Sequence, residues 1–236
     1  MVGFSDHKST AAVWYKLLNC GFRLPTAAGT DAMANYASLR GPVGLNRVYA
    51  EVPKGSLEIA PWLASLKAGH TFATNGPLIG FTLGEKKVGD ELKLPAANQE
   101  VKFSAWMRSI VPVDHLQVVC NGKVVRDLNT SADKQSADVE GMLPIASSGW
   151  CVLRAWSEKA EYPILDLYPY ATTSPVYISV EGSPLHSPED AAYFLAWIDR
   201  VEKSVAGFHD WNTDAEKASV MDMIAKARAM YQGLAK

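Results

Sequence analysis

The segment LQVVCNGKVVRDL, residues 116–128, decides the fold of the middle of this chain. Its two halves, residues 116–120 and 124–128, carry the β-branched side chains that are typical of strands. Asn121 and Gly122 separate the halves, and both residues tolerate the positive φ that a type I′ turn requires. The segment therefore predicts a β-hairpin.

Further strand-like runs lie on both sides of this hairpin. We expect strands at 78–83, 101–107, 150–156 and 176–180, because these runs are rich in β-branched and aromatic residues and are separated by Gly, Pro, Asn and Ser. Short strands at such regular spacing indicate an antiparallel β-sandwich. We assign residues 75–182 to it.

Helical patterns come before the sandwich. Residues 1–74 combine predicted helices at 9–20 and 57–68, the second capped by Ser56, with a predicted strand at 45–52. This alternation is typical of an α/β fold. The turn signal Asn75-Gly76-Pro77 then ends the helical periodicity, so we place a boundary there.

Two helix-start signals lie in residues 183–236. In Ser187-Pro188-Glu189-Asp190 the serine can cap, proline suits the first helical position and Asp190 can accept from the serine amide. Thr213 and Glu216 form a second capping box. The chain is expected to end in a helical hairpin, and its fold class is α+β.

The bulk properties exclude several kinds of partner. The formal charge of -2 gives no field that would attract nucleic acid or an anionic membrane surface. The apolar runs are far shorter than the ~20 residues of a membrane-spanning helix, and the first residues do not resemble a signal peptide. We expect a soluble protein, and its compartment stays open.

The sequence contains no complete catalytic set. His-x-His, Gly-x-Ser-x-Gly and phosphate-binding glycine motifs are missing, and the five histidines are scattered. Cys20, Cys120 and Cys151 have neither metal-clip nor disulfide-framework spacing, so we interpret them as inert buried thiols. No residue is therefore assigned a catalytic role.

Three residues are candidates for binding. Asp31 follows Gly29-Thr30 in a turn and could bind zinc, manganese or iron; an Asp in such a turn also commonly caps a helix or braces a loop. Arg47 and Asn75 lie at turns next to strands and could bind an anionic or carbonyl-bearing substrate. Ordinary loop pairing is the alternative for both.

Several short motifs occur in an order that resembles one protein family. They are Gly29-Thr30-Asp31, Gly69 to Pro77, Gly89-Asp90-Glu91-Leu92, Asn121-Gly122, Gly149-Trp150 and Thr173 to Tyr177. Together they resemble the CehA/McbA-like branch of the polymerase-and-histidinol-phosphatase (PHP) metal-dependent hydrolases. That resemblance implies an α/β barrel with a divalent metal cluster, followed by a β-sandwich and a helical end.

The resemblance covers the carboxy-terminal portion of such a hydrolase. Residues 1–74 would then be the last elements of the barrel, with Asp31 at a metal position and Met33 where the family has histidine. The amide, carbamate or phosphoester chemistry of the family would need ligands that this chain lacks, so the chain alone is expected to be inactive. Exposed barrel edges predict self-association through residues 1–74.

A second hypothesis assigns the chain to another class of protein. The β-sandwich would be a non-catalytic module that recognises a carbohydrate or a protein partner. Aromatic residues of the sandwich, including Trp106, Trp150 and Trp156, could stack on sugar rings or pack in the core. Exposed aromatics paired on one sheet face would favour the sugar-binding interpretation.

Overall fold

The chain forms two compact units in the computed structural model, which describes residues 1, 5–33, 41–55 and 58–236. The first unit comprises Met1–Leu18 and Arg23–Pro184, and the second comprises Asn19–Phe22 and Leu185–Lys236. None of the helices in these described ranges has the length and apolar character needed to cross a membrane. The units are described separately below.

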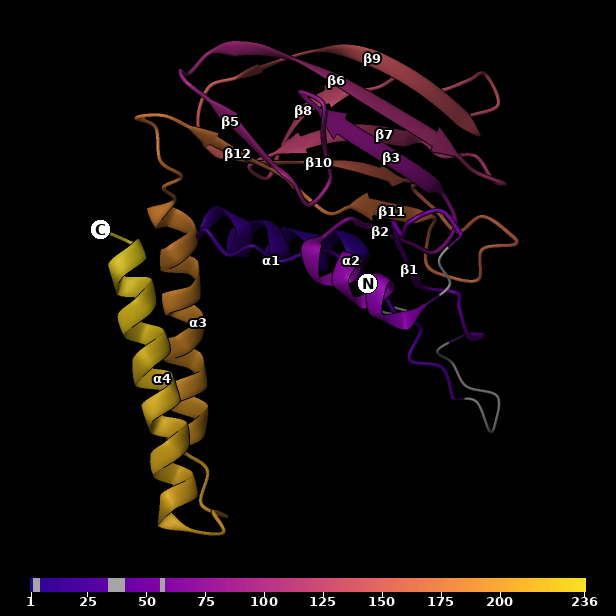
Figure 1. Ribbon diagram of the computed structural model, residues 1–236. Coiled ribbons are helices and arrows are strands. Elements are labelled where there is room, and N and C mark those ends of the chain that lie inside the picture. The colour runs from indigo at the N-terminus through magenta and orange to yellow at the C-terminus, as the bar shows by residue number, and fades with distance from the viewer. Residues whose placement is uncertain (2–4, 34–40, 56–57) are drawn as a thin grey trace. The chain divides into compact units, whose positions relative to one another are not determined.

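Two β-sheets pack face to face in the first unit (Figure 1). The smaller sheet has the order β4 (Lys86–Lys87), β3 (Leu78–Leu83), β6 (Gln99–Arg108), β9 (Ser136–Ile145). The larger sheet contains β1 (Arg47–Ala50), β2 (Thr71–Thr74), β5 (Glu91–Leu94), β7 (His115–Cys120), β8 (Lys123–Asp127), β10 (Gly149–Trp156), β11 (Tyr170–Thr173) and β12 (Val176–Val180). Its strands pair antiparallel except for β5 with β12.

The core between the sheets follows from alternation along the strands. On β6, Val101, Phe103, Ala105 and Met107 are buried while their neighbours face outward. Side chains of β7, β10 and β12 in the larger sheet meet them in one cluster. Period-two burial on facing strands is what a sandwich requires, so the two-sheet prediction is confirmed in outline.

The hairpin at residues 116–128 is also confirmed. Strands β7 and β8 pair antiparallel, and the turn residues Asn121 and Gly122 have φ values of 49° and 81°. Strands β2, β4, β5, β9 and β11 are additional to those we expected. Their sequences contain more polar residues, glycine or proline than the strands that the pattern identified.

Residues 1–74 do not show the barrel remnant that we expected within the described ranges. Strand β1 is shorter than the predicted 45–52 and pairs antiparallel with β2, which pairs antiparallel with β11. Parallel barrel strands would need helical crossovers between them. Instead, β2 continues through Asn75-Gly76-Pro77 directly into β3, so this region contributes to the larger sheet of the sandwich.

Two helices belong to the first unit. Helix α1 (His7–Asn19) packs Ala11 and Tyr15 against Trp150 on the outer face of the larger sheet, and the Tyr15 and Trp150 ring centroids lie 4.9 Å apart. Helix α2 (Ile59–Ala68) ends at Gly69, whose φ of 82° gives the left-handed C-cap. The predicted cap at Ser56 lies outside the described residues.

The prediction of three buried thiols is wrong for two of them. Cys120 and Cys151 lie directly opposite each other on β7 and β10 and form a disulfide, whereas Cys20 is free and buried. Their separation of 31 residues gave no sequence signal. The pairing of these two cysteines follows from the register of β7 and β10, which places them opposite each other.

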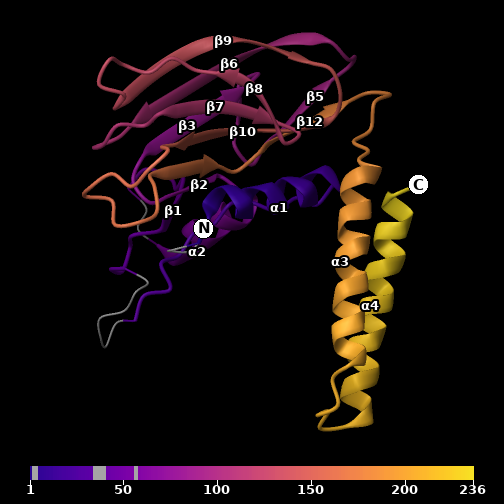
Figure 2. The same cartoon turned by 180° about the vertical axis from the view of Figure 1, so that it is seen from behind.

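The second unit is dominated by a helical pair, α3 (Pro188–Ala206) and α4 (Asp214–Leu234) (Figure 2). Thr213 caps α4 by accepting from the Glu216 amide at 3.1 Å, as predicted. At α3, proline occupies the first turn, and Asp190 accepts from the Ser187 hydroxyl. The predicted helical hairpin is confirmed.

Candidate functional site

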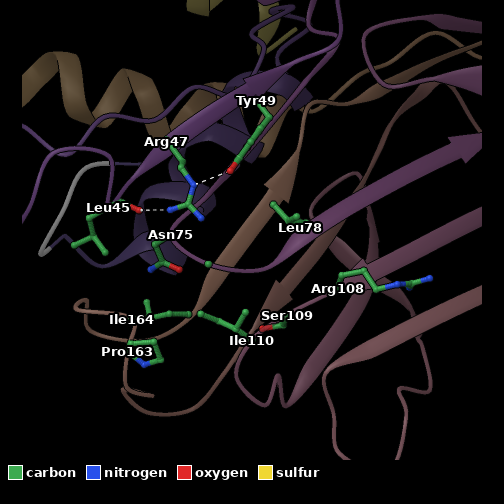
Figure 3. A pocket seen from close by; sticks show the side chains of 11 residues that line it. Leu45, Arg47, Tyr49, Asn75, Leu78, Arg108, Ser109, Ile110, Pro163 and Ile164 are labelled. Carbon is green, nitrogen blue, oxygen red and sulfur yellow. Dashed lines mark hydrogen bonds between the residues drawn. The ribbon is translucent and has the colours of Figure 1, made fainter. Parts of the chain in front are cut away.

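A cavity of about 420 Å³ opens where strands of the two sheets end in the first unit (Figure 3). We call it the Arg47 pocket. Strand β1, the turn between β2 and β3, the end of β6 and the loop before β11 all contribute to it. Its lining residues are Leu45, Arg47, Tyr49, Asn75, Gly76, Leu78, Arg108, Ser109, Ile110, Pro163 and Ile164.

Arg47 is held in a fixed orientation at the pocket wall. Its Nε donates to the Tyr49 hydroxyl at 3.0 Å, and its Nη1 donates to the carbonyls of Gly44 and Leu45 at 3.1 and 3.2 Å. The Tyr49 ring is stacked on Phe72, with centroids 4.9 Å apart. These contacts restrict the long side chain, and restriction reduces the entropy lost when a ligand binds.

Arg47 has no carboxylate partner in the described part of the chain. Arg108, the other arginine of the lining, differs in this respect. Its Nη2 donates to both carboxylate oxygens of Asp138 at 2.9 and 2.8 Å, and Figure 3 shows its side chain directed away from the other labelled residues. The positive charge available to the pocket is therefore that of Arg47.

Asn75 forms the buried end of the pocket and connects it to the framework. Its Nδ2 donates to Asp166 Oδ2 at 3.1 Å and to the Tyr168 carbonyl at 2.8 Å, while its Oδ1 accepts from the Tyr170 amide at 2.7 Å. These bonds use both protons of the amide. The structure therefore gives Asn75 a role in holding the wall, and its predicted contact with a substrate stays a prediction.

Asp166 is the centre of a buried polar cluster behind Asn75. Its Oδ2 also accepts from His7 Nε2 and from Asn46 Nδ2, both at 3.0 Å. Burial raises the pKa of Asp166, but the hydrogen bonds from His7, Asn75, the Leu167 amide and Asn46 together outweigh it and hold that pKa below its ordinary value. The carboxylate is therefore ionised and fixes four segments of the chain.

A second carboxylate supports the start of α1. Asp6 accepts from the Ser9 hydroxyl, the Tyr168 hydroxyl and the Lys8 amide. The Ser9 hydrogen bond, followed by that from Tyr168, lowers the pKa of Asp6 to about 2. Burial, followed by the bond to Asp6, raises the pKa of Tyr168 to about 12. The hydrogen bonds from Ser9 and Tyr168 thus stabilise the charged carboxylate of Asp6 at the N-terminus of α1.

The predicted metal residue lies away from any ligand cluster that the structure describes. Asp31 is exposed and has a φ of 57°, a value that short polar residues adopt in turns. No group of three or more His, Cys, Asp and Glu side chains with metal-site geometry occurs in the described ranges. The side chains described around Asp31 thus do not fit a metal cluster, and its metal role stays a prediction.

The motifs on which the family resemblance rests meet one another in the first unit. A Cβ at Gly89 would lie 2.6 Å from the last carbonyl oxygen of α2, so only glycine allows this approach. His70 Nε2 lies 3.2 Å from Asp90 Oδ1, and the hydroxyls of Thr71 and Ser174 lie 2.7 Å apart. These contacts join the start of β2 to the residues that precede β5 and β12.

Two further motifs, Asn121-Gly122 and Gly149-Trp150, also contact each other. Asn121 Oδ1 accepts from the Trp150 amide at 2.9 Å, and a Cβ at Gly149 would lie 1.9 Å from that oxygen. The turn of the hairpin is thereby joined to the start of β10. Residues of these motifs therefore make contacts that hold the first unit together.

The three tryptophans Trp106, Trp150 and Trp156 do not form a paired platform on one sheet face. Trp150 is fully buried beneath α1, and Trp156 stacks on His115 with centroids 4.0 Å apart. Trp106 is 40% exposed and lies over Gly80, where a Cβ would come within 2.1 Å of the indole nitrogen. A single exposed ring on the smaller sheet gives little support to sugar recognition.

Comparison with known proteins gives few matches. No family model and no curated protein matches the chain. Solved structures that are similar include the solution and crystal structures of a CARDB domain from Pyrococcus furiosus, the crystal being a complex with di-metal ions. They are 16% and 17% identical, cover 44% and 45% of this chain and 95% and 96% of that domain, and each has a TM-score of 0.29. Likeness at this score is too low to assign a fold or a function.

Proposed function

We propose that the first unit is a non-catalytic β-sandwich that binds a small molecule in the Arg47 pocket. The observation that supports this function is the orientation of Arg47, whose charge has no carboxylate partner in the described residues and faces a cavity. Orienting contacts on an arginine at a cavity wall are typical of binding sites. The cavity volume of about 420 Å³ suits a compact organic ligand.

That the chain is the carboxy-terminal portion of a PHP-like metal-dependent hydrolase is a separate proposal, and it rests on the sequence motifs. In that case residues 1–74 would complete a barrel, Asp31 would contact a divalent metal and the chain alone would be inactive. The described residues support a binding role more directly, because the motifs have the structural contacts given above. Self-association through residues 1–74 likewise stays a prediction.

The proposed function is tested by protein-observed NMR of the whole chain with a library of charged and neutral fragments. We expect some fragments to shift the amide signals of Gly76, Ser109 and Ile110, which line the pocket. Leu78→Trp should fill the cavity and abolish these shifts. Val124→Trp, at an exposed position of β8, is the matched control and should retain them.

Two results would overturn this function. The binding claim fails when no fragment shifts the pocket amides at millimolar concentration, or when Leu78→Trp binds as the wild type does. The non-catalytic claim fails when the purified chain hydrolyses ester, amide or phosphoester reporters above a buffer control and Leu78→Trp removes that activity.

A further inference from the structure

We infer that the ligand of the Arg47 pocket is a compact apolar carboxylate, a planar monoanion attached to a small hydrocarbon or aromatic group. This inference rests on the proposed function, because it names the chemical class of the bound molecule. It follows from three features of the pocket: the free donors at one end, the balance of charge around them, and the apolar side chains across the cavity.

The free donors are two adjacent groups on β1. Arg47 Nη2 makes no hydrogen bond to a described residue, while Nε and Nη1 are engaged. The Tyr49 hydroxyl accepts from Arg47 Nε, so its own proton is available. A guanidinium nitrogen beside a phenol presents N–H and O–H donors that match the two oxygens of a carboxylate.

The charge around these donors favours a monoanion. The lining residues that the structure describes include no Asp or Glu, and the second arginine among them, Arg108, is neutralised by the bidentate bond to Asp138. Among the described lining residues, the one positive charge without a carboxylate partner balances one negative charge, and the ionised Asp166 behind Asn75 further disfavours a second one. A phosphate dianion would retain an excess negative charge here, because no second free cation faces it among the described lining residues.

The remaining wall selects the body of the ligand. Ile110, Pro163 and Ile164 lie on the opposite side of the pocket from Arg47, and Leu78 lies at its side (Figure 3). Burial of apolar ligand surface against these side chains favours binding. The same side chains offer few hydrogen-bond partners to a sugar hydroxyl. Polar groups at one end and aliphatic groups at the other therefore match an apolar acid.

The test compares benzoate with benzamide, which has nearly the same shape and no charge, by isothermal titration of the whole protein. We expect benzoate to bind about tenfold more tightly, because it makes charge-assisted hydrogen bonds to Arg47. Arg47→Gln should remove that preference. Arg126→Gln, an exposed arginine on β8, is the control and should retain it. Phenyl phosphate should bind more weakly than benzoate.

A second variant guards against misfolding of Arg47→Gln. Tyr49→Phe keeps the ring that stacks on Phe72 and removes one donor, so benzoate binding should weaken about threefold and benzamide binding by less, because a neutral carbonyl accepts a weaker hydrogen bond. Equal binding of benzoate and benzamide to the wild type, or stronger binding of phenyl phosphate, would overturn the ligand class and leave the proposed function standing. Failure of every fragment to bind the pocket would instead overturn the proposed function.

Discussion

Asn75→Ala should be among the most destabilising single substitutions in the first unit. The change removes the donors to Asp166 and the Tyr168 carbonyl and the acceptor of the Tyr170 amide. A buried group left unsatisfied costs about 1–3 kcal/mol, so the two backbone groups alone predict a loss of about 2–6 kcal/mol. Water entering through the pocket sets the lower end of this range.

Urea unfolding followed by circular dichroism measures this loss. Asn129→Ala, an exposed asparagine after β8, is the control and should change the free energy of unfolding by less than about 0.5 kcal/mol. Asn75→Asp places a second carboxylate beside Asp166, so it should be destabilised at pH 7 and partly recover as lower pH protonates it. A loss below about 1 kcal/mol for Asn75→Ala would refute the assigned framework role.

Three further predictions concern stability. Because the pKa of Asp6 is lowered from 3.8 to about 2, its contribution to the free energy of unfolding is present above pH 4 and is lost as pH falls toward 2. The urea midpoint of Asp6→Asn should therefore depend less on pH than that of the wild type over this range. An equal pH dependence of the two midpoints would contradict the shift. Gly89→Ala should cost about 1–3 kcal/mol more than Gly182→Ala, which has a similar positive φ and open space, and equal losses in thermal unfolding would contradict the close approach. Reduction of Cys120–Cys151 should lower the free energy of unfolding by about 2–4 kcal/mol, and an unchanged midpoint with reductant would show that the disulfide contributes nothing.

The parts of the fold that the sequence predicts are those set by local chemistry. The 116–128 hairpin follows from two residues that accept positive φ, and the start of α4 follows from the Thr213 cap. Strand β9 (Ser136–Ile145) was missed because Gly141 and Pro144 interrupt its pattern, and pairing along β6 stabilises it nevertheless. In residues 1–74 the structure shows antiparallel strands of the sandwich where we expected barrel elements, because the alternation of helices and strands does not reveal which strands will pair.

Some residues of the candidate site could be identified from the sequence, and others could not. Arg47 and Asn75 were identifiable as polar residues at strand-adjacent turns, and both line the pocket. Asp166 carried no signal, because it lies in a loop and its partners His7 and Asn75 are 159 and 91 residues away along the chain. Long-range contacts of this kind, like the disulfide, depend on which strands pair and in what register. Local patterns in the sequence do not reveal either.

A crystal structure of the whole chain with saturating benzoate would test the central claim most directly. We predict the carboxylate at Arg47 Nη2 and the Tyr49 hydroxyl, with the ring against Ile110 and Ile164. The claim would be contradicted by an empty Arg47 pocket in a crystal form that leaves it open to solvent, or by benzoate bound elsewhere.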